Sequence, residues 1–352
     1  MSLRTFQLIT HPAFLSFIES SRLQLELFPH TRAELTPFHR PDIQETADIA
    51  KYLGISPLAV RGMLISKHKH YRSFEVQKKS GGMRQIDAPR TYLKVVQWWI
   101  LSTILESVEA SPHAFGFVKN RSYVDNARFH LGAAHVLNVD IEDFFPSIKT
   151  HHVEKIFRSF GYRESIAAAL SHLTTYAGVL PQGAPTSPSL ANIYMTPLDS
   201  AINEIAAQRH LKFSRYADDI TLSGHNKIDA GVINEIEEAL AKYSLRLNPK
   251  KTKFMGANEQ KEVTGLVLAE TGVAFPQEFL NSARGWFHRV AKDPKRYRDD
   301  YDKIRGTLST IRYVGGRGSP SVIRLGAAAV AAVEQSFFTN VVPFTVNVDL
   351  DK

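Results

Sequence analysis

Apolar residues recur along this chain at two spacings, one typical of helices and the other of strands. Helical spacing predicts helices over residues 42–65 (as two short helices), 92–107, 150–176, 188–208, 227–243 and much of the chain from 276 onward. Asp42 is the expected N-cap and Gly54 the expected stop of the first of these two helices, and Trp98 and Trp99 are expected in the core. Short apolar runs predict strands over 136–139, 263–268 and 341–348.

Two β-hairpins are expected where apolar segments flank a turn. Residues 71–86 alternate weakly and break at Ser80-Gly81-Gly82. The apolar segments 213–216 and 220–222 lie on either side of Asp218-Asp219. Because helices and strands alternate irregularly, the pattern predicts an α+β fold.

Composition restricts the class of protein. The chain has 352 residues, of which 43% are hydrophobic and 22% charged, and this balance excludes a disordered or fibrous protein. It contains no cysteine, which excludes disulfides, thiolate metal sites and a cysteine nucleophile. We find no run of about 18 apolar residues and no secretory signal pattern at the start. We therefore expect a soluble, cytosolic protein with no membrane partner.

The charge points to a polyanionic partner. Lysine and arginine outnumber aspartate and glutamate 43 to 35, which gives a formal charge of +8. Residues 66–90 carry seven basic and two acidic residues, and 282–325 carry eleven and four. Two acidic groups, one around Asp140 and one at Asp218-Asp219, lie between these basic regions. Such an arrangement suits an enzyme acting on a phosphate polymer, although each basic run is equally compatible with an ordinary solvated surface.

The acidic residues occur in unusually apolar surroundings. Asp140 follows an apolar strand, and Asp218 and Asp219 occupy a turn between two others. Charged groups in such places are normally paired or bound to a metal. Oxygen ligands without His or Cys nearby favour Mg²⁺ or Mn²⁺. Two such ions about 3.5–4 Å apart could activate an attacking hydroxyl and stabilise a leaving pyrophosphate, although an Asp-Asp turn alone is also common on exposed surfaces.

The order of these motifs resembles that of reverse transcriptases. Tyr216-Ala217-Asp218-Asp219 is similar to their YxDD box, and Asp140 with Phe145 five residues later resembles their first acidic motif. Gln182-Gly183 resembles their substrate-binding motif, and Lys251 lies in a segment similar to their lysine-bearing loop. Together the motifs extend over roughly residues 74–325.

Two shorter strings narrow the resemblance to retron reverse transcriptases. Asn126-Ala127-Arg128-Phe129-His130 matches the NAxxH string of that group, and Val263-Thr264-Gly265 matches its VTG string. Ile304-Arg305-Gly306 resembles part of the retron thumb. These strings argue against another prokaryotic reverse transcriptase, such as that of a group II intron.

The resemblance implies a right-hand polymerase with an α+β fold. Its parts would be an N-terminal helical extension (1–65), fingers (66–135, with part of 144–200), a palm with an antiparallel sheet and the aspartates (136–268), and a basic helical thumb with the C-terminal tail (269–352). The implied activity is RNA-directed DNA synthesis on a cognate structured noncoding RNA in the cytoplasm of a bacterium. The implied product is branched DNA, made for anti-phage defence with an effector protein. A non-synthesising RNA-binding scaffold is the alternative.

The resemblance also assigns roles to single residues. Asp140, Asp218 and Asp219, with the backbone carbonyl of Ile141, would hold two Mg²⁺ ions (Mn²⁺ is possible), and Lys251 would protonate the leaving pyrophosphate. The residues expected to contact the incoming deoxynucleoside triphosphate are Arg84, Lys78, Phe145, Gln182 and Gly183, with Phe145 excluding a 2′-hydroxyl. Lys78 and Lys251 are equally compatible with an ordinary surface position.

Further residues are expected to contact nucleic acid. Tyr216 would lie under the primer terminus, and Asn126 and His130 would either contact primer or template or serve a structural part. The expected RNA-binding residues are Arg284, Trp286, Arg289, Arg305 and Arg312. The alternative for this last group is an ordinary amphipathic helix bundle whose aromatic residues form its core.

Overall fold

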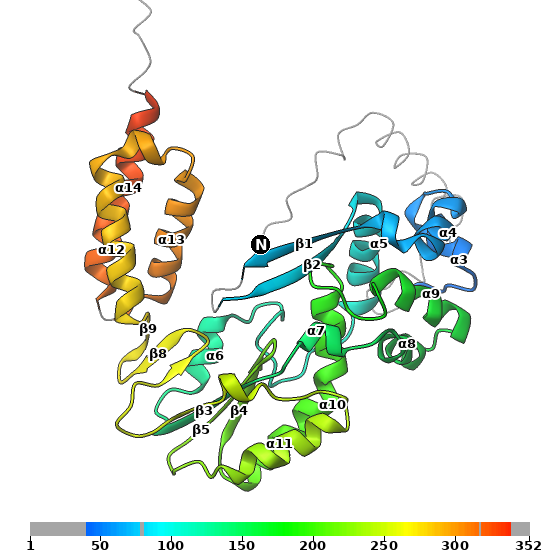
Figure 1. Cartoon of the computed structure of the whole chain (residues 1–352), viewed down its shortest axis with the longest axis horizontal. Helices are drawn as coiled ribbons and strands as arrows, with labels where there is room; N and C mark the ends of the chain where they lie inside the picture. Colours follow the sequence, from blue (N-terminus) through cyan, green and yellow to red (C-terminus); the bar gives the residue numbers. More distant parts are fainter. Residues whose placement is uncertain (1–39, 78–80, 317, 339–352) are drawn as a thin grey trace, which may run out of the picture. The chain divides into compact units, whose positions relative to one another are not determined.

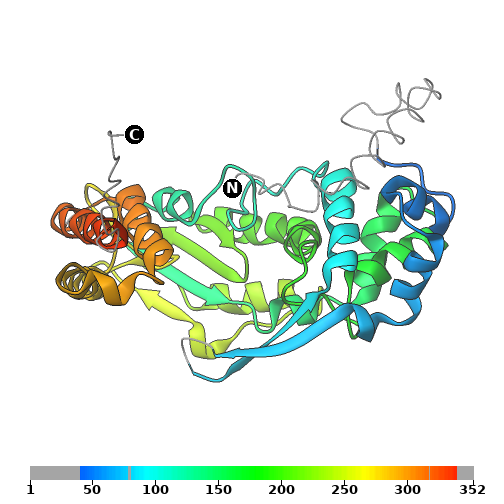
Figure 2. The same ribbon diagram turned by 90° about the horizontal axis from the view of Figure 1, so that it is seen from above.

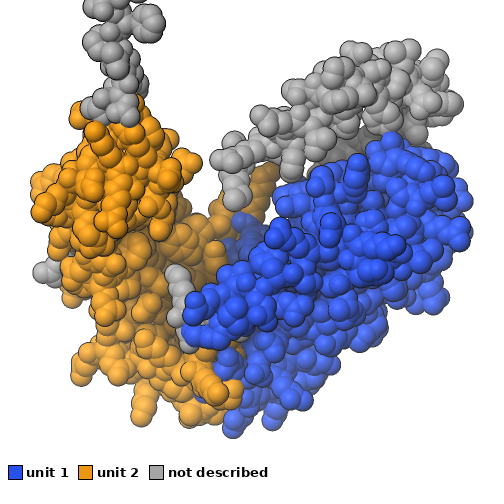
Figure 3. All heavy atoms as spheres, turned by 45° about the horizontal axis from the view of Figure 1, so that its top comes forward, with its two compact units in different colours: residues 1–118, 141–204, 233–248 blue, residues 119–140, 205–232, 249–352 orange. Residues whose placement is uncertain are grey.

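The computed structural model describes residues 40–77, 81–316 and 318–338. Its contacts divide the chain into two compact units, coloured separately in Figure 3. Unit 1 comprises Met1–Val118, Ile141–Glu204 and Ile233–Asn248, and unit 2 comprises Lys119–Asp140, Ile205–Val232 and Pro249–Lys352. Helices accompany antiparallel sheets in this chain (Figure 1), which confirms the predicted mixed α+β class.

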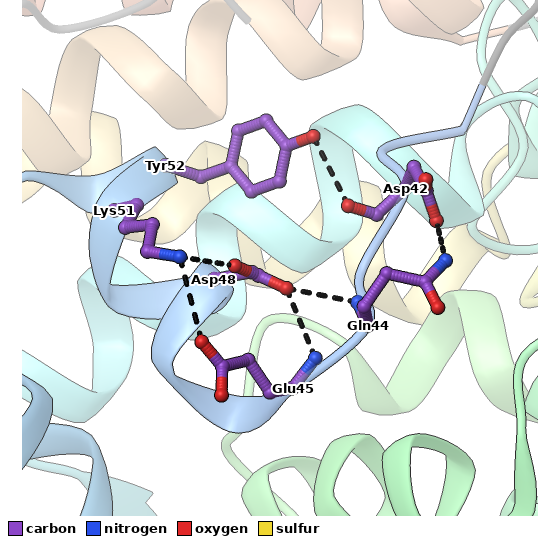
Figure 4. Close-up of polar contacts among 6 residues, drawn as sticks. All are labelled: Asp42, Gln44, Glu45, Asp48, Lys51 and Tyr52. Carbon is purple, nitrogen blue, oxygen red and sulfur yellow. Dashed lines mark hydrogen bonds and ion pairs between the residues drawn. The ribbon is translucent and has the colours of Figure 1, made fainter.

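Unit 1 begins with the predicted pair of short helices, α3 (Thr46–Leu53) and α4 (Pro57–Ile65). The first helix starts later than expected because Asp48, not Asp42, satisfies its free amides: its Oδ2 accepts from the backbone N–H groups of Gln44 and Glu45, both at 2.9 Å (Figure 4). Asp42 instead accepts hydrogen bonds from the Gln44 side chain and, through its carbonyl, from Tyr52. Gly54 ends the helix in the left-handed conformation, as predicted.

The first predicted hairpin is present. Strands β1 (Tyr71–Gln77) and β2 (Met83–Pro89) pair antiparallel from Tyr71↔Pro89 to Gln77↔Met83 (Figure 1). The buried ring of Tyr71 fixes the root of the hairpin, because it stacks on Tyr176 at 4.3 Å and accepts a hydrogen bond from Gln97. Most residues of the two strands beyond this root are exposed.

The other helices that lie wholly in unit 1 are α5 (Thr91–Ile100), which continues into a π-helical turn (Leu101–Leu105), α7 (Phe144–Ser147), α8 (Thr150–Ser159) and α9 (Glu164–Thr174). The single helical stretch expected over 150–176 is therefore interrupted, and Gly161 with φ 92° lies in the break. The core placement of Trp98 is wrong: its side chain is 46% exposed, whereas Trp99 is half-buried and stacks on Tyr52. Helices α10 (Ser187–Gln208) and α11 (Gly231–Ala241) each contribute to both units.

Unit 2 contains a four-stranded antiparallel sheet in the order β4-β5-β3-β6. Its strands are β3 (His135–Asp140), β4 (Lys212–Tyr216), β5 (Asp219–Gly224) and β6 (Lys253–Met255), so the predicted strand before Asp140 and the second hairpin are both present. Leu137, Phe213 and Leu222 are buried in this sheet. Helix α6 (Tyr123–Phe129) precedes β3 in the chain.

A second, smaller sheet replaces the single strand expected over 263–268. It consists of β7 (Glu262–Val263), β8 (Leu266–Ala269) and β9 (Gly272–Ala274). Thr264 and Gly265, with φ of 48° and 77°, form a two-residue hairpin loop between Val263 and Leu266. The VTG string therefore marks a turn, and Val263 and Leu266 pack with Val124 of α6 in one buried cluster.

The basic C-terminal stretch forms three helices, α12 (Gln277–Lys292), α13 (Tyr301–Val314) and α14 (Ser319–Phe338), which Figure 2 shows nearly end-on. Phe287, Leu308 and Val322 belong to their shared core. Gly326 permits close packing there, because a Cβ at this position would lie only 2.8 Å from the Phe287 ring. In the part of the chain that the structure describes, no helix has the length and apolar character needed to span a membrane. The tail predicted as a strand (341–348) lies outside that part.

Candidate active site

The sheet of unit 2 gathers three aspartates at one end. Asp140 is the last residue of β3 and pairs in register with Asp219, the first residue of β5. Asp219 also pairs with Tyr216 of β4, so that Ala217 and Asp218 form the two-residue loop of this hairpin. Strand pairing therefore brings together two motifs that lie more than 70 residues apart in the sequence.

A buried arginine supports this loop. Ala217 has φ 58°, a left-handed backbone conformation that residues other than glycine rarely adopt. The Arg215 side chain is fully buried, and its Nη1 donates a hydrogen bond of 3.0 Å to the Ala217 carbonyl. Since Ala217 immediately precedes Asp218, Arg215 holds the backbone that carries the aspartates.

The three carboxylates create a local excess of negative charge. Burial and the neighbouring charges of Asp218 and Asp140 raise the pKa of Asp219 to about 7. Lys251, at the end of a 3₁₀ turn (Pro249–Lys251), offsets part of this charge by donating from Nζ to Asp140 Oδ2 at 2.6 Å. Burial lowers the pKa of Lys251, but the hydrogen bond and charge of Asp140, with the charges of the other two aspartates, outweigh that effect and raise it. The ammonium is therefore protonated at neutral pH.

The donor chemistry of this site fits a hard divalent cation. It offers carboxylate oxygens, and the pKa of Asp219 shows that these carboxylates are short of positive charge. Among the described residues, however, no group of three or more Asp, Glu or His side chains is already arranged to hold a metal ion. The fourth expected ligand, the Ile141 carbonyl, belongs to unit 1, where Ile141 forms an isolated bridge with Leu247.

Gln182 and Gly183, two of the residues expected to bind a nucleotide, lie against strand β2 in unit 1. The backbone N–H of Asp87 on β2 donates to the Gln182 carbonyl at 2.8 Å. Gly183 has φ 126°, and a Cβ there would lie 3.2 Å from the Asp87 carbonyl oxygen, so this close approach requires glycine. Gln182 Oε1 is buried without a hydrogen-bond partner among the described residues. Arg84 is exposed on the same strand, three residues before Asp87, and Lys78 lies outside the described residues.

Phe145, the expected sugar-contacting residue, also lies in unit 1. It is half-buried in the short helix α7, which begins after Asp143, a residue with φ 43°. Its ring lies 5.3 Å from that of buried Phe144 and 6.1 Å from that of exposed Phe117. Phe117 has no counterpart in the sequence-based predictions.

Asn126 and His130 of the NAxxH string are both buried. His130 is fully buried and bridges two strands: Nδ1 bonds with Ser223 Oγ at 2.6 Å and Nε2 with Ser214 Oγ at 2.7 Å. Burial, with a smaller effect from Lys212, lowers the pKa of His130 to about 3 and keeps the ring neutral. Asn126 is also fully buried, but its side-chain Nδ2 and Oδ1 have no hydrogen-bond partner among the described residues. The contacts of His130 therefore support its structural alternative, whereas Asn126 has no side-chain hydrogen bond there that would support one.

Tyr216 and the basic helices keep positions compatible with their predicted roles. Tyr216 is half-buried at the end of β4, beside the aspartates in the strand register. Trp286 is half-buried, stacks on the core residue Phe287 and carries the Lys303 ammonium over its ring at 5.3 Å, so it takes part in both core and surface. The predicted arginines of α12 and α13 are all exposed: Arg284, Arg289, Arg305 and Arg312.

Sequence reasoning missed Arg215 and Phe117. Arg215 belongs to the motif string, but nothing in the pattern distinguishes a buried guanidinium that holds a turn from a surface arginine. Phe117 approaches Phe145 from a segment 28 residues earlier in the chain. Neither contact leaves a periodic or compositional signal.

Comparison with known proteins agrees with this geometry. Residues 76–268 match the family model described as reverse transcriptase (RNA-dependent DNA polymerase). The chain is 35% identical to the retron Ec86 reverse transcriptase of Escherichia coli, over 80% of this chain and 88% of that protein. It is 29% identical to the retron Mx162 reverse transcriptase (80% of this chain, 66% of that one) and 31% identical to the retron Mx65 reverse transcriptase (74% and 66%), both of Myxococcus xanthus.

Among solved structures, a telomerase from Candida albicans in complex with a fragment of telomeric RNA matches with a TM-score of 0.41 and 8% identity, over 75% of this chain and 61% of that one. This likeness is too low to bear on the argument. The family match and the retron relatives identify the chain: it belongs to the reverse transcriptase (RNA-dependent DNA polymerase) family and, within it, to the retron reverse transcriptases.

Proposed function

We propose that this chain copies a cognate structured noncoding RNA into DNA that stays joined to the RNA through a 2′-hydroxyl. The observation that carries the proposal is the meeting of Asp140, Asp218 and Asp219 at one end of a sheet, with Lys251 bonded to Asp140. This set supplies the acidic ligands and the proton donor that nucleotidyl transfer requires.

Asp140 and Asp218 would hold two Mg²⁺ ions, for which Mn²⁺ could substitute, and Asp219 and the Ile141 carbonyl would complete the ligands. When bound, these ions would activate the attacking hydroxyl and stabilise the charge that develops on the phosphates. Arg215 keeps the Ala217–Asp218 loop in place. Lys251 is charged at neutral pH and can protonate the leaving pyrophosphate.

Residues of unit 1 would select the incoming deoxynucleoside triphosphate. Gln182 Oε1, which has no hydrogen-bond partner among the described residues, and the tight packing of Gly183 against β2 support a place for the Gln182-Gly183 motif in this selection. Arg84 on the exposed part of β2 suits bidentate contact with the triphosphate, and Lys78 would assist. Phe145 would lie against the sugar and exclude a 2′-hydroxyl.

In this proposal the polymerase parts would be those expected from the sequence: an N-terminal extension (1–65), fingers (66–135, with part of 144–200), a palm (136–268) and a thumb with the tail (269–352). The exposed arginines of α12 and α13 support RNA binding by the thumb, and Tyr216 would support the primer end. The names and bacterial sources of the relatives support a retron role in a bacterium. A cytoplasmic location, an effector protein and a part in anti-phage defence belong to the same proposal and follow from the motif resemblance.

Sequencing of the nucleic acid that copurifies with the protein from its native host tests the proposal. We expect DNA joined to RNA by a 2′,5′ linkage, released as two linear strands by a debranching enzyme. The Asp218→Asn/Asp219→Asn protein, purified in parallel, should carry the RNA without DNA. Linear DNA alone from the wild-type protein would contradict retron-type priming, and RNA alone would favour the scaffold alternative.

A further inference from the structure

Phe117 combines two unfavourable features in one residue. Its φ of 60° lies in the left-handed region, where the Cβ of any residue other than glycine is crowded, and its large apolar side chain is 51% exposed. A strained conformation persists only where the surrounding structure enforces it, and such residues concentrate at functional sites. An exposed aromatic ring held at this cost contributes little to folding, so its contacts indicate what it does instead.

The segment around Phe117 is held by a distant part of unit 1. Asn192 of α10 donates from Nδ2 to the carbonyl of Gly116 at 2.9 Å in a buried contact that joins residues 76 positions apart. Just before it, the Ala114 backbone N–H donates to the Ser111 carbonyl at 3.1 Å. Helix α10 begins four residues after Gly183, so the same stretch of chain fixes Phe117 and carries the Gln182-Gly183 motif.

The ring that Phe117 contacts is that of Phe145. The two ring centroids lie 6.1 Å apart with an interplanar angle of 48°, within the range of favourable aromatic pairs. Phe145 also contacts buried Phe144, with ring centroids 5.3 Å apart. Phe145 is therefore in contact with a buried core ring and with an exposed ring whose neighbouring backbone is bonded by Asn192.

We propose that Phe117 is a positioning residue for sugar selection: it keeps the Phe145 ring from turning away when a 2′-hydroxyl presses against it. This inference rests on the proposed role of Phe145 as the residue that excludes ribonucleotides. A side chain at Phe145 excludes an extra hydroxyl only if it cannot move away, and the contact with the Phe117 ring restricts its movement. Phe117 therefore determines discrimination between deoxyribonucleotides and ribonucleotides without touching either.

Single-nucleotide incorporation on a primed RNA template tests this inference. We compare kcat/KM for a deoxynucleotide with that for the matching ribonucleotide, because a merely structural role would change both equally. Phe117→Ala should lower this ratio by about 2- to 12-fold, the loss that corresponds to one aromatic pair. Phe117→Tyr keeps the ring and should keep the ratio.

Two further variants distinguish loss of the Phe117 ring from strain in its backbone and from the general effect of removing an exposed aromatic side chain. Asn tolerates a positive φ, so Phe117→Asn should lower the ratio as Phe117→Ala does, with less loss of stability. Phe254→Ala removes an aromatic residue of similar exposure (42%) on β6 and should leave the ratio unchanged. Because Phe117 acts through Phe145, the double variant with Phe145→Ala should discriminate no worse than Phe145→Ala alone.

The outcomes distinguish this inference from the proposed function. A wild-type ratio in both Phe117→Ala and Phe117→Asn would overturn the inference. A double variant whose ratio falls by the product of the two single-variant losses would overturn it as well. If Phe145→Ala lowers the ratio in the same experiment, the proposed role of Phe145 stands even when the inference fails. A wild-type protein that incorporates no nucleotide at all would instead overturn the proposed function.

Discussion

At the scale of single residues, the carboxylates and their counter-charge decide what the site can do. Asp140 is almost completely buried, and the Lys251 ammonium bonds directly to it. A buried carboxylate without a counter-charge is costly. Lys251 therefore both stabilises the aspartate cluster and provides a proton close to it.

Replacement of Lys251 separates these two contributions. Lys251→Ala should slow single-turnover nucleotide incorporation by about 100-fold or more, because general acid catalysis is lost. Lys251→Arg keeps the charge beside Asp140 but holds its proton too tightly to donate it, so it should preserve folding and still be slow. An Ala variant with wild-type incorporation would contradict the proton-donor role.

His130 makes the stability of the protein depend on pH. Its pKa is lowered to about 3 in the folded chain, whereas an exposed histidine titrates near 6.5, so below pH 6.5 the unfolded state binds more protons than the folded state. Stability contributed by the neutral ring is complete above pH 6.5 and decreases as pH falls. Between pH 7 and pH 5, we expect His130 to contribute a decrease of about 2 kcal/mol to the free energy of unfolding, measured in urea as the difference from a variant that lacks this imidazole.

His130→Gln is the matched control for this prediction, because its side chain can bond with Ser214 and Ser223 but does not titrate. Its unfolding free energy should lack the part of the pH slope that comes from His130. An identical slope in both proteins would show that the wild-type imidazole is not held neutral by the fold.

At the scale of elements, the hairpin loop between β7 and β8 shows how a motif residue can be both strained and stabilising. Thr264, in the VTG string, is a β-branched residue with φ 48°, and its hydroxyl donates to the Tyr123 carbonyl of α6 at 2.8 Å. The methyl group makes this conformation unfavourable, while the hydroxyl compensates by tying the small sheet to the helix.

Substitutions at Thr264 resolve these opposing effects. Thr264→Ser keeps the hydroxyl and removes the branch, so it should raise the free energy of unfolding by about 0.5–1 kcal/mol. Thr264→Val keeps the branched side chain and loses the hydrogen bond, so this variant should lower the free energy of unfolding by about 1–3 kcal/mol. Urea unfolding of the three proteins measures both changes, and a Ser variant less stable than wild type would contradict the strain argument.

The same scale shows how far the sequence predicts the structure. Apolar periodicity correctly located most helices and both hairpins around Gly81 and Asp218, because those signals depend on neighbouring residues. It mistook 263–268 for one strand, since Thr-Gly is not among the common hairpin dipeptides such as Asn-Gly. Contacts between distant segments, such as Phe117 with Phe145 and His130 with two serines, left no local signal. Arg215 lies only two residues from Ala217, but nothing in the pattern shows that its guanidinium is buried.

At the scale of the whole molecule, the expected functional residues are distributed between the two units. The aspartates, Lys251 and the exposed arginines of the helical bundle belong to unit 2, and the residues expected to select the nucleotide belong to unit 1. The chain passes from one unit to the other between Asp140 and Ile141. The positive charge of the chain, +8 overall, is consistent with a polymerase that binds nucleic acid over a large surface.

The most direct test of the central claim is primer extension on an RNA template, with RNA affinity measured in parallel. Asp218→Asn/Asp219→Asn should abolish DNA synthesis while RNA affinity stays within about 3-fold of wild type, because only the acidic ligands are lost. Asp229→Asn, an exposed acid elsewhere in unit 2, is the matched control and should extend primers normally. Continued synthesis by the double variant would contradict the assignment of these aspartates as the catalytic centre.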